Sequence, residues 1–216
     1  MPPTKTLPLS ESLRPKHFAD MALPRALRQR LQAMVDKNNL MNMIFYGSPG
    51  TGKSTAARIL AGYDKRQLSV MVINGTEESG VDLVRQRIAT FARTASLNLA
   101  PYKLCVIDEA DQLSESAQEV LRGLIESTYS NCRFIFTAND ITKIHDALQS
   151  RLLPICFDLA STDQDEVLRD YTKRFLSQLR ERECPFDEAR IRQLISMRFP
   201  DFRAIANRVE YELGGI

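Results

Sequence analysis

The sequence has 216 residues, of which 44% are apolar, enough for a substantial core. Its 29 basic and 27 acidic residues leave a formal net charge of +2, so total charge does not by itself indicate nucleic acid. There is no apolar run of about 18 residues and no signal-like N-terminus, which predicts a cytoplasmic protein with no membrane contact.

Four cysteines are widely spaced and form no C-x-x-C pair, which favours reduced thiols over zinc ligands or disulfides. They are Cys105, Cys132, Cys156 and Cys184.

Residues 1–12 are rich in proline and lack apolar periodicity, so we expect a flexible N-terminal arm. Apolar residues then recur at helical spacing between Ala26 and Val35, which predicts an amphipathic helix.

A glycine-rich stretch from Gly47 to Thr55 follows the apolar run Met43–Tyr46 and leads into a helical pattern. Its glycines permit the backbone conformations and close approach with which N–H groups surround a polyphosphate, and the helix N-terminus adds positive potential. In such a P-loop, Lys53 reaches the β- and γ-phosphates of ATP and the Ser54 hydroxyl binds Mg2+. We expect nucleotide contacts along the whole loop: Gly47, Ser48, Pro49, Gly50, Thr51, Gly52, Lys53, Ser54 and Thr55.

A second predicted strand covers residues 69–73, and a helix is expected to begin near Ser79. This helix carries several arginines, among them Arg85. They fit either an ordinary solvated helix face or a surface that contacts phosphates.

The third predicted strand, 103–107, is apolar throughout, as expected of a strand covered on both faces. It ends in Asp108 and Glu109, at the edge where a nucleotide-binding α/β sheet carries acidic residues. Asp108 is placed to hold Mg2+, and Glu109 to orient and deprotonate a water. The letters D-E-A-D also occur in RNA helicases, but the chain has no room after residue 160 for the second domain that those enzymes need.

Ser114 is predicted to cap a helix that ends near Ile125, and a fourth strand covers residues 133–137. Asn139 follows that strand, where an amide can position the attacking water or serve as a turn residue. A short helical stretch ending at Arg151 precedes a fifth strand, 152–157.

From residue 160 onward the pattern is helical, with a break at Phe199-Pro200 and Asp201 as the N-cap of the last helix. The fold class predicted is therefore α/β: a five-stranded parallel sheet flanked by helices, with a small helical lid. We place the nucleotide-binding domain at 13–159 and the lid at 160–216.

The order of these motifs resembles the AAA+ ATPases, and within them the sliding-clamp loaders, most closely the ATPase subunit of T4-type bacteriophage clamp loaders. The resemblance covers residues 13 to 213 and rests on the P-loop, Val106–Asp111, Asn139, Ser150-Arg151 and Phe199–Arg203.

The resemblance implies roles for further residues. Asn139 looks like sensor 1, and Arg203 looks like the sensor 2 arginine that reaches the phosphates from the lid. Arg151 looks like the arginine finger that acts on ATP held by a neighbouring subunit. Gln118 resembles a glutamine that relays DNA binding to the ATP site, although a buried amide satisfied locally is nearly as good an interpretation.

The helices beginning near Ser79 and Ser114 resemble those that line the inside of the family's spiral. Their N-terminal amides and Arg85 are then expected to contact DNA phosphates, with little readout of bases.

Three features depart from the family pattern. Leu152 replaces the cysteine beside the finger, and Leu13 replaces the aromatic residue before Arg14-Pro15, the segment expected near the adenine. Clamp loaders also continue into a helical collar, whereas this sequence ends at Ile216. Both a shortened chain and a natural core that assembles differently fit this last difference.

Taken together, the sequence predicts an Mg-ATP-dependent ATPase of a clamp loader. ATP binding would drive assembly with other AAA+ subunits, a sliding clamp and primer-template DNA, in a pentamer-type ring if a collar is supplied, and hydrolysis would drive release. An AAA+ helicase loader remains an alternative in the same class. A structural subunit that binds nucleotide without hydrolysing it is an alternative in another.

Overall fold

The computed structural model describes residues 8–37, 39–62, 69–95, 102–182 and 185–214. The chain divides into two compact units. The sheet unit comprises Arg30–Ser48 and Lys53–Asp158, and the helical unit comprises Met1–Gln29, Pro49–Gly52 and Leu159–Ile216.

The sheet unit is built on a five-stranded parallel sheet, which confirms the predicted fold class. Its strands are β1 (Met43–Tyr46), β2 (Val70–Asn74), β3 (Lys103–Asp108), β4 (Cys132–Ala138) and β5 (Leu153–Cys156). Their order is β2-β3-β4-β1-β5, so β1 lies between β4 and β5. Parallel strands end at the same edge, and the polar residues that follow β1, β3 and β4 therefore meet there.

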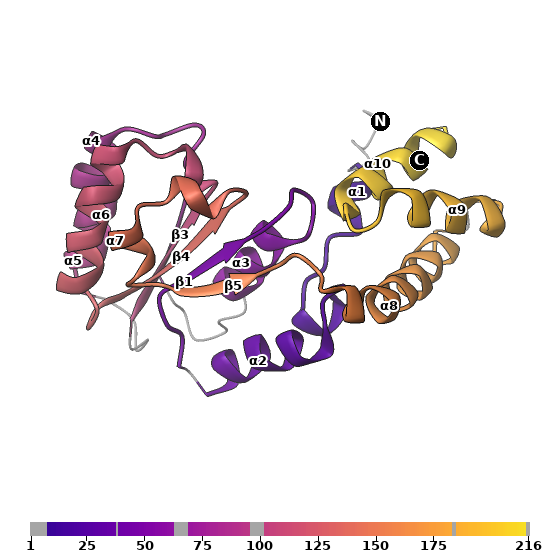
Figure 1. Ribbon diagram of the computed structural model, residues 1–216, viewed down its shortest axis with the longest axis horizontal. Coiled ribbons are helices and arrows are strands. Elements are labelled where there is room, and N and C mark those ends of the chain that lie inside the picture. The colour runs from indigo at the N-terminus through magenta and orange to yellow at the C-terminus, as the bar shows by residue number, and fades with distance from the viewer. Residues whose placement is uncertain (1–7, 38, 63–68, 96–101, 183–184, 215–216) are drawn as a thin grey trace, which may run out of the picture. The chain divides into compact units, whose positions relative to one another are not determined.

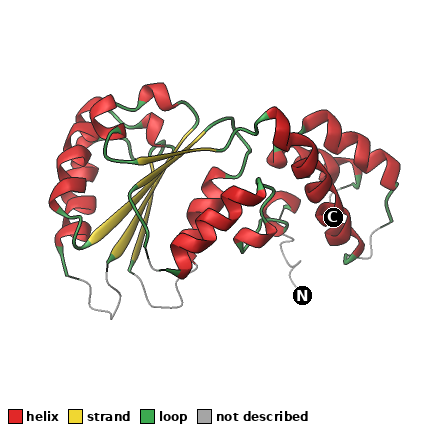
Figure 2. Cartoon of the chain, turned by 60° about the horizontal axis from the view of Figure 1, so that its bottom comes forward, coloured by secondary structure: helices red, strands yellow, loops and turns green. Residues whose placement is uncertain are grey.

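Apolar side chains on both faces of the sheet explain why helices cover it on two sides (Figures 1 and 2). Cys105 and Ile107 belong to a core shared with Ile88 and with Leu121. Helix α3 contacts β1, β3 and β4. Helix α2 (Arg25–Asp36) begins in the helical unit and continues into the sheet unit from Arg30. The other helical elements of the sheet unit are α3 (Lys53–Gly62), α4 (Val81–Leu83), the π-helical turn η2 (Val84–Ile88), α5 (Ala89–Arg93), η3 (Ala110–Gln112), α6 (Glu115–Ser127), η4 (Ile141–Lys143) and α7 (Asp146–Gln149).

The helical unit gathers α1 (Leu9–Ser12), η1 (Phe18–Asp20), α8 (Ser161–Arg180), α9 (Glu188–Arg198) and α10 (Phe202–Glu212). Leu9 is buried in a core with apolar residues of α8, α9 and α10. Helix α1 contacts α10 (Figure 1). The expected flexible arm therefore needs correction at Leu9–Ser12, because burial of one leucine fixes this turn; residues 1–7 lie outside the described residues.

The grouping of the chain differs from a simple division near residue 160. Segments up to Gln29 and the apex of the P-loop, Pro49–Gly52, group with the C-terminal helices rather than with the sheet. The start of α10 follows the prediction, because the Asp201 carboxylate accepts a hydrogen bond from the Ala204 N–H and caps this helix.

Candidate nucleotide site

The loop between β1 and α3 brings its lysine back onto its own backbone. Lys53 Nζ donates hydrogen bonds to the carbonyl oxygens of Gly47 and Ser48, at 2.7 and 2.8 Å. Gly47, Gly50 and Gly52 have φ of 132°, 78° and 99°, in the region that favours glycine. These three glycines thus adopt the kind of backbone conformation that the sequence predicted for the loop.

An acidic residue beyond β5 also holds this loop. Asp158 Oδ1 accepts a hydrogen bond of 2.7 Å from the Ser48 N–H. The end of β5 is itself bonded to β1, because the Phe157 N–H donates to the Tyr46 carbonyl at 2.8 Å. Asp158 therefore ties the start of the P-loop to the neighbouring strand.

The predicted Mg2+ ligands lie next to each other. Ser54, in the first turn of α3, donates its hydroxyl hydrogen to Asp108 Oδ1 at 2.7 Å. The same carboxylate oxygen accepts a hydrogen bond from the hydroxyl of Thr137 on β4. Two hydroxyl donors from different elements therefore orient Asp108.

Glu109 has a left-handed backbone conformation, with φ 55° and ψ 47°, and among the described residues no other non-glycine has a positive φ. Its N–H donates to Thr137 Oγ1 at 3.0 Å. Gly75 approaches closely from the end of β2, since a Cβ there would lie 2.4 Å from the Glu109 carbonyl oxygen. The carboxylate of Glu109 accepts a hydrogen bond from the Thr76 hydroxyl at Oε2.

Asn139 is exposed just after β4, and its backbone is fixed by Asp111. Asp111 Oδ2 accepts hydrogen bonds from the N–H groups of Asn139 and Asp140, at 3.3 and 3.4 Å. Asp111 is 8% exposed. Its Oδ1 is buried without a hydrogen-bond partner among the described residues. A buried carboxylate thus holds the turn that presents Asn139.

Gln118 on α6 is 2% exposed, and its amide is satisfied locally. It donates to the carbonyl oxygens of Leu113 and Lys143 and accepts from the His145 N–H. This geometry matches the local interpretation of Gln118 and connects α6 to the segment after Asn139.

Arg151 is bound at the far end of α6. Its guanidinium pairs with Glu126 and donates to the Ala147 carbonyl oxygen. None of the contacts that the structure describes for Arg151 involves Lys53, Asp108 or Glu109.

The predicted lid residues belong to the helical unit. The Phe202 N–H donates to the Gly50 carbonyl at 3.1 Å, and a Cβ on Gly50 would lie 2.0 Å from Asp201 Oδ1. The start of α10 therefore packs on the P-loop apex, one residue before the exposed Arg203. Arg14, predicted near the adenine, pairs with Glu11 of α1.

The candidate DNA-contacting residues come together at two helix starts. The Ser114 N–H donates to the Ser79 carbonyl at 3.1 Å, and Ser114 Oγ caps α6 by accepting from the Ala117 N–H, which confirms the predicted cap. Arg85 is exposed on the π-helical turn, whereas Arg87 pairs with Glu78.

Two of the described cysteines lie in the core, where a thiol is unsuited to nucleophilic chemistry. Cys105 and Cys132 are buried, and burial raises the pKa of the Cys132 thiol to about 12. Cys156 is exposed, and Cys184 lies outside the described residues. No group of three or more His, Cys, Asp or Glu side chains in the described ranges could hold a metal ion unaided.

The site fits ATP with Mg2+, because this ion normally takes few protein ligands and completes its shell with water and phosphate. A hydroxyl and a carboxylate 2.7 Å apart at a helix N-terminus, beside a glycine-rich loop and its lysine, define a P-loop nucleotide-binding site. The pattern of the ATPase family associated with various cellular activities (AAA) matches residues 43–157. The chain belongs to this family of ATPases.

Relatives by sequence in several organisms are named as subunits of replication factor C. The chain is 38% identical over 155 residues to replication factor C small subunit 2 of Pyrobaculum islandicum, covering 68% of this chain and 47% of the relative. It is 30% identical over 205 residues to replication factor C small subunit of Sulfolobus acidocaldarius, covering 93% of this chain and 61% of the relative. The chain thus spans about half the length of the first of these relatives.

Solved structures agree on the fold. The RuvB Holliday junction branch migration motor of Thermotoga maritima matches with a TM-score of 0.67 and 20% identity, covering 92% of this chain and 64% of that one. At this identity the likeness concerns the fold alone. In the part of the chain that the structure describes, no helix is long and apolar enough to cross a membrane.

Four polar residues around the site had no role in the sequence prediction: Thr76, Asp111, Thr137 and Asp158. Thr137 could have been noticed, because it is a polar residue at the end of an apolar strand, two positions before Asn139. The others follow strand ends through turns whose path the sequence does not specify.

Proposed function

We propose that this chain is an ATPase subunit of a sliding-clamp loader that acts in DNA replication. The observation that carries the proposal is the pairing of Ser54 Oγ with Asp108 Oδ1 at the sheet edge, beside Lys53 and Glu109. The replication factor C relatives support the assignment to clamp loading. Among clamp loaders, the finer resemblance to the T4-type phage subunit rests on the order of the sequence motifs.

In this proposal, the loop from Gly47 to Thr55 surrounds the phosphates of ATP. Lys53, which now binds two loop carbonyls, exchanges them for phosphate oxygens. Ser54 and Asp108 hold Mg2+, which supplies charge neutralisation at the phosphates when bound. Glu109 accepts the proton of the attacking water, and Asn139 orients that water.

Two arginines complete the site in this proposal. Arg203 acts from the lid of the same subunit, which the packing of Phe202 against Gly50 supports. Arg151 acts on the ATP of a neighbouring subunit, after exchanging Glu126 for phosphate. A subunit whose finger serves a neighbour requires an oligomer, so other AAA+ subunits are part of the proposed assembly.

Primer-template DNA is the proposed nucleic acid, contacted at its phosphates by Arg85 and by the helix starts near Ser79 and Ser114. Because the formal net charge is only +2, a DNA-contacting surface in this proposal depends on the local placement of basic groups and not on total charge. Replacing Arg85 should then weaken DNA affinity and make its salt dependence shallower.

The decisive experiment measures ATP hydrolysis with and without primer-template DNA and a candidate clamp, alongside the mass of the assembly. Stimulation by both is expected. Hydrolysis stimulated by DNA but indifferent to every clamp offered would reject clamp loading and favour another DNA-associated remodeller.

Mixing variants tests the shared site. Arg151→Ala and Lys53→Ala are each expected to be inactive alone, whereas a mixture regains turnover where a Lys53 site meets a neighbour's Arg151. Full turnover by a dilute wild-type monomer would contradict the assignment of the finger.

A further inference from the structure

One buried hydroxyl connects both acidic residues of the proposed site. Thr137 lies near the end of β4, between the apolar residues Phe136 and Ala138, and it is 2% exposed. Its Oγ1 donates to Asp108 Oδ1 and accepts from the Glu109 N–H, the latter at 3.0 Å. A hydroxyl has a single hydrogen to donate, so the direction of this one is fixed by Asp108.

The contact with Asp108 has a consequence for the carboxylate's orientation. Oδ1 accepts two hydrogen bonds, from Thr137 and from Ser54. These donors hold the plane of the carboxylate relative to α3 and β4, and so fix the direction of Oδ2. Without the Thr137 donor, the Ser54 hydroxyl would be the one remaining side-chain donor to Asp108 Oδ1 among the described residues.

The contact with Glu109 has a different consequence. A left-handed conformation is unfavourable for a residue with a Cβ, and it persists only when surrounding contacts hold it. The Thr137 oxygen holds the N–H of Glu109 itself, while the Gly75 N–H donates to the preceding carbonyl, that of Asp108, at 2.8 Å. This backbone conformation determines where the Glu109 carboxylate points.

We propose that Thr137 is a positioning residue of the ATPase site, whose single hydroxyl orients Asp108 toward Mg2+ and Glu109 toward the attacking water. The inference rests on the proposed ATP hydrolysis and names a residue that acts through the other two. Neither Thr137 nor its hydroxyl is expected to contact ATP.

Three substitutions isolate the hydroxyl. Thr137→Val keeps the shape of the side chain and removes both hydrogen bonds, whereas Thr137→Ser keeps the hydroxyl. Thr128→Val is the matched control, because Thr128 lies just before β4 in the same unit, is also 2% exposed, and donates to the Leu124 carbonyl at 2.8 Å. Should valine at 137 prevent folding, Thr137→Ala replaces it.

The first readout is the Mg2+ dependence of binding of a non-hydrolysable ATP analogue. Thr137→Val should shift the Mg2+ midpoint upward by about tenfold or more, as expected for loss of one hydrogen bond to a charged group. Thr137→Ser and Thr128→Val should keep the wild-type Mg2+ midpoint. This should hold even if Thr128→Val lowers the melting temperature of the protein as much as Thr137→Val does.

The second readout is steady-state hydrolysis. Thr137→Val should lower kcat by about tenfold and leave KM within about twofold, because it misplaces catalytic groups without removing a contact to ATP. Thr137→Ser should recover most of that loss. In a Glu109→Gln background, Thr137→Val should lower kcat much less, because the group that it positions is already disabled.

The inference is overturned if Thr137→Val behaves like Thr128→Val in both readouts, or if serine is as impaired as valine. Absence of hydrolysis by the wild-type assembly would instead count against the proposed function. The Mg2+ midpoint alone would then decide for or against the role of Thr137 at Asp108.

Discussion

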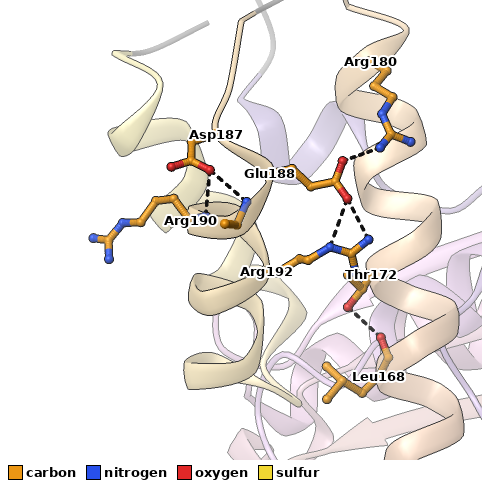
Figure 3. A network of polar contacts seen from close by, with 8 residues as sticks. Leu168, Thr172, Arg180, Asp187, Glu188, Arg190 and Arg192 are labelled. Carbon is orange, nitrogen blue, oxygen red and sulfur yellow. Dashed lines mark hydrogen bonds and ion pairs between the residues drawn. The ribbon is translucent and has the colours of Figure 1, made fainter.

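Carboxylates accept hydrogen bonds in two very different settings in this molecule. At the acidic edge of the sheet, Asp108 and Asp111 are held by hydroxyl and backbone donors of the neighbouring strand end and of α3. On the helical unit, Glu188 of α9 is held by the guanidinium groups of Arg180 and Arg192 (Figure 3).

The difference lies in how firmly the donors are anchored. Thr137 is 2% exposed in a central strand, so its hydroxyl has little freedom. The side chains of Arg180 and Arg192 are 59% and 55% exposed. Holding such long side chains in one conformation costs side-chain entropy, and the electrostatic attraction of an exposed ion pair in water is too weak to offset much of that cost. Buried short donors therefore specify geometry, whereas exposed arginines mainly make the surface soluble.

The largest expected effect is at the acidic edge. Glu109→Gln removes the proposed base and should lower ATP turnover at least about 100-fold, while ATP binding is retained. Phosphate release and nucleotide binding measure the two effects. Glu119→Gln on the exposed face of α6 is the matched control, and unchanged turnover in Glu109→Gln would remove the assignment of the base.

The next effect concerns Asp111, whose Oδ2 holds the turn at Asn139. Asp111→Ala leaves two backbone N–H groups without this acceptor and should cost about 1–3 kcal/mol in the free energy of unfolding. Asp111→Asn keeps an acceptor and should cost much less.

Urea unfolding and ATP turnover of both Asp111 variants provide the measurement. If alanine lowered turnover no more than asparagine, the turn at Asn139 would not depend on this carboxylate.

The sequence was sufficient to predict the sheet, and it was sufficient to select candidate nucleotide residues, because both follow from strong local signals. Apolar runs such as Lys103–Asp108 ended in acidic or polar residues, and parallel pairing brought those ends to one edge. The caps at Ser114 and Asp201 were also predictable, since capping depends on residues within one turn.

What the sequence could not supply were contacts set by turns and by close approach. The Thr76 hydroxyl bonds to Glu109 from 33 positions away, after a turn that begins at Gly75. Likewise, the burial of Leu9 against distant helices is invisible in a proline-rich segment without periodicity. Such contacts depend on tertiary packing, which local propensity does not determine.

A smaller effect on stability is expected from removing an N-cap side chain, and each unit offers one helix for this comparison. Ser114→Ala removes one hydrogen bond, of 3.2 Å, and Asp187→Ala removes two, of 2.9 and 3.3 Å (Figure 3). Each should lower the free energy of unfolding by about 1 kcal/mol. Ser114→Ala should in addition weaken DNA binding, whereas Asp187→Ala should not.

Thermal unfolding and DNA titration of both cap variants provide the measurement, with Ser116→Ala in the first turn of α6 as the control. Equal loss of DNA affinity in all three would contradict a specific role for the start of α6.

The smallest effect is expected at the exposed ion pairs. Hydrogen bonds from Arg192 and Arg180 lower the pKa of Glu188 below its ordinary value of 4.5. A lowered folded-state pKa stabilises the protein above the unfolded value, and this contribution is lost as the pH falls through the folded one. Glu188→Gln should therefore have at most a slight effect on thermal unfolding at neutral pH, and none once the pH is well below 4.5.

Because the ion pairs of Glu188 are exposed, added salt should also reduce the difference in melting temperature between Glu188→Gln and the wild type. A large loss of stability at neutral pH that survives high salt would show that Glu188 is held as firmly as Asp108, and would remove the distinction drawn between the two settings.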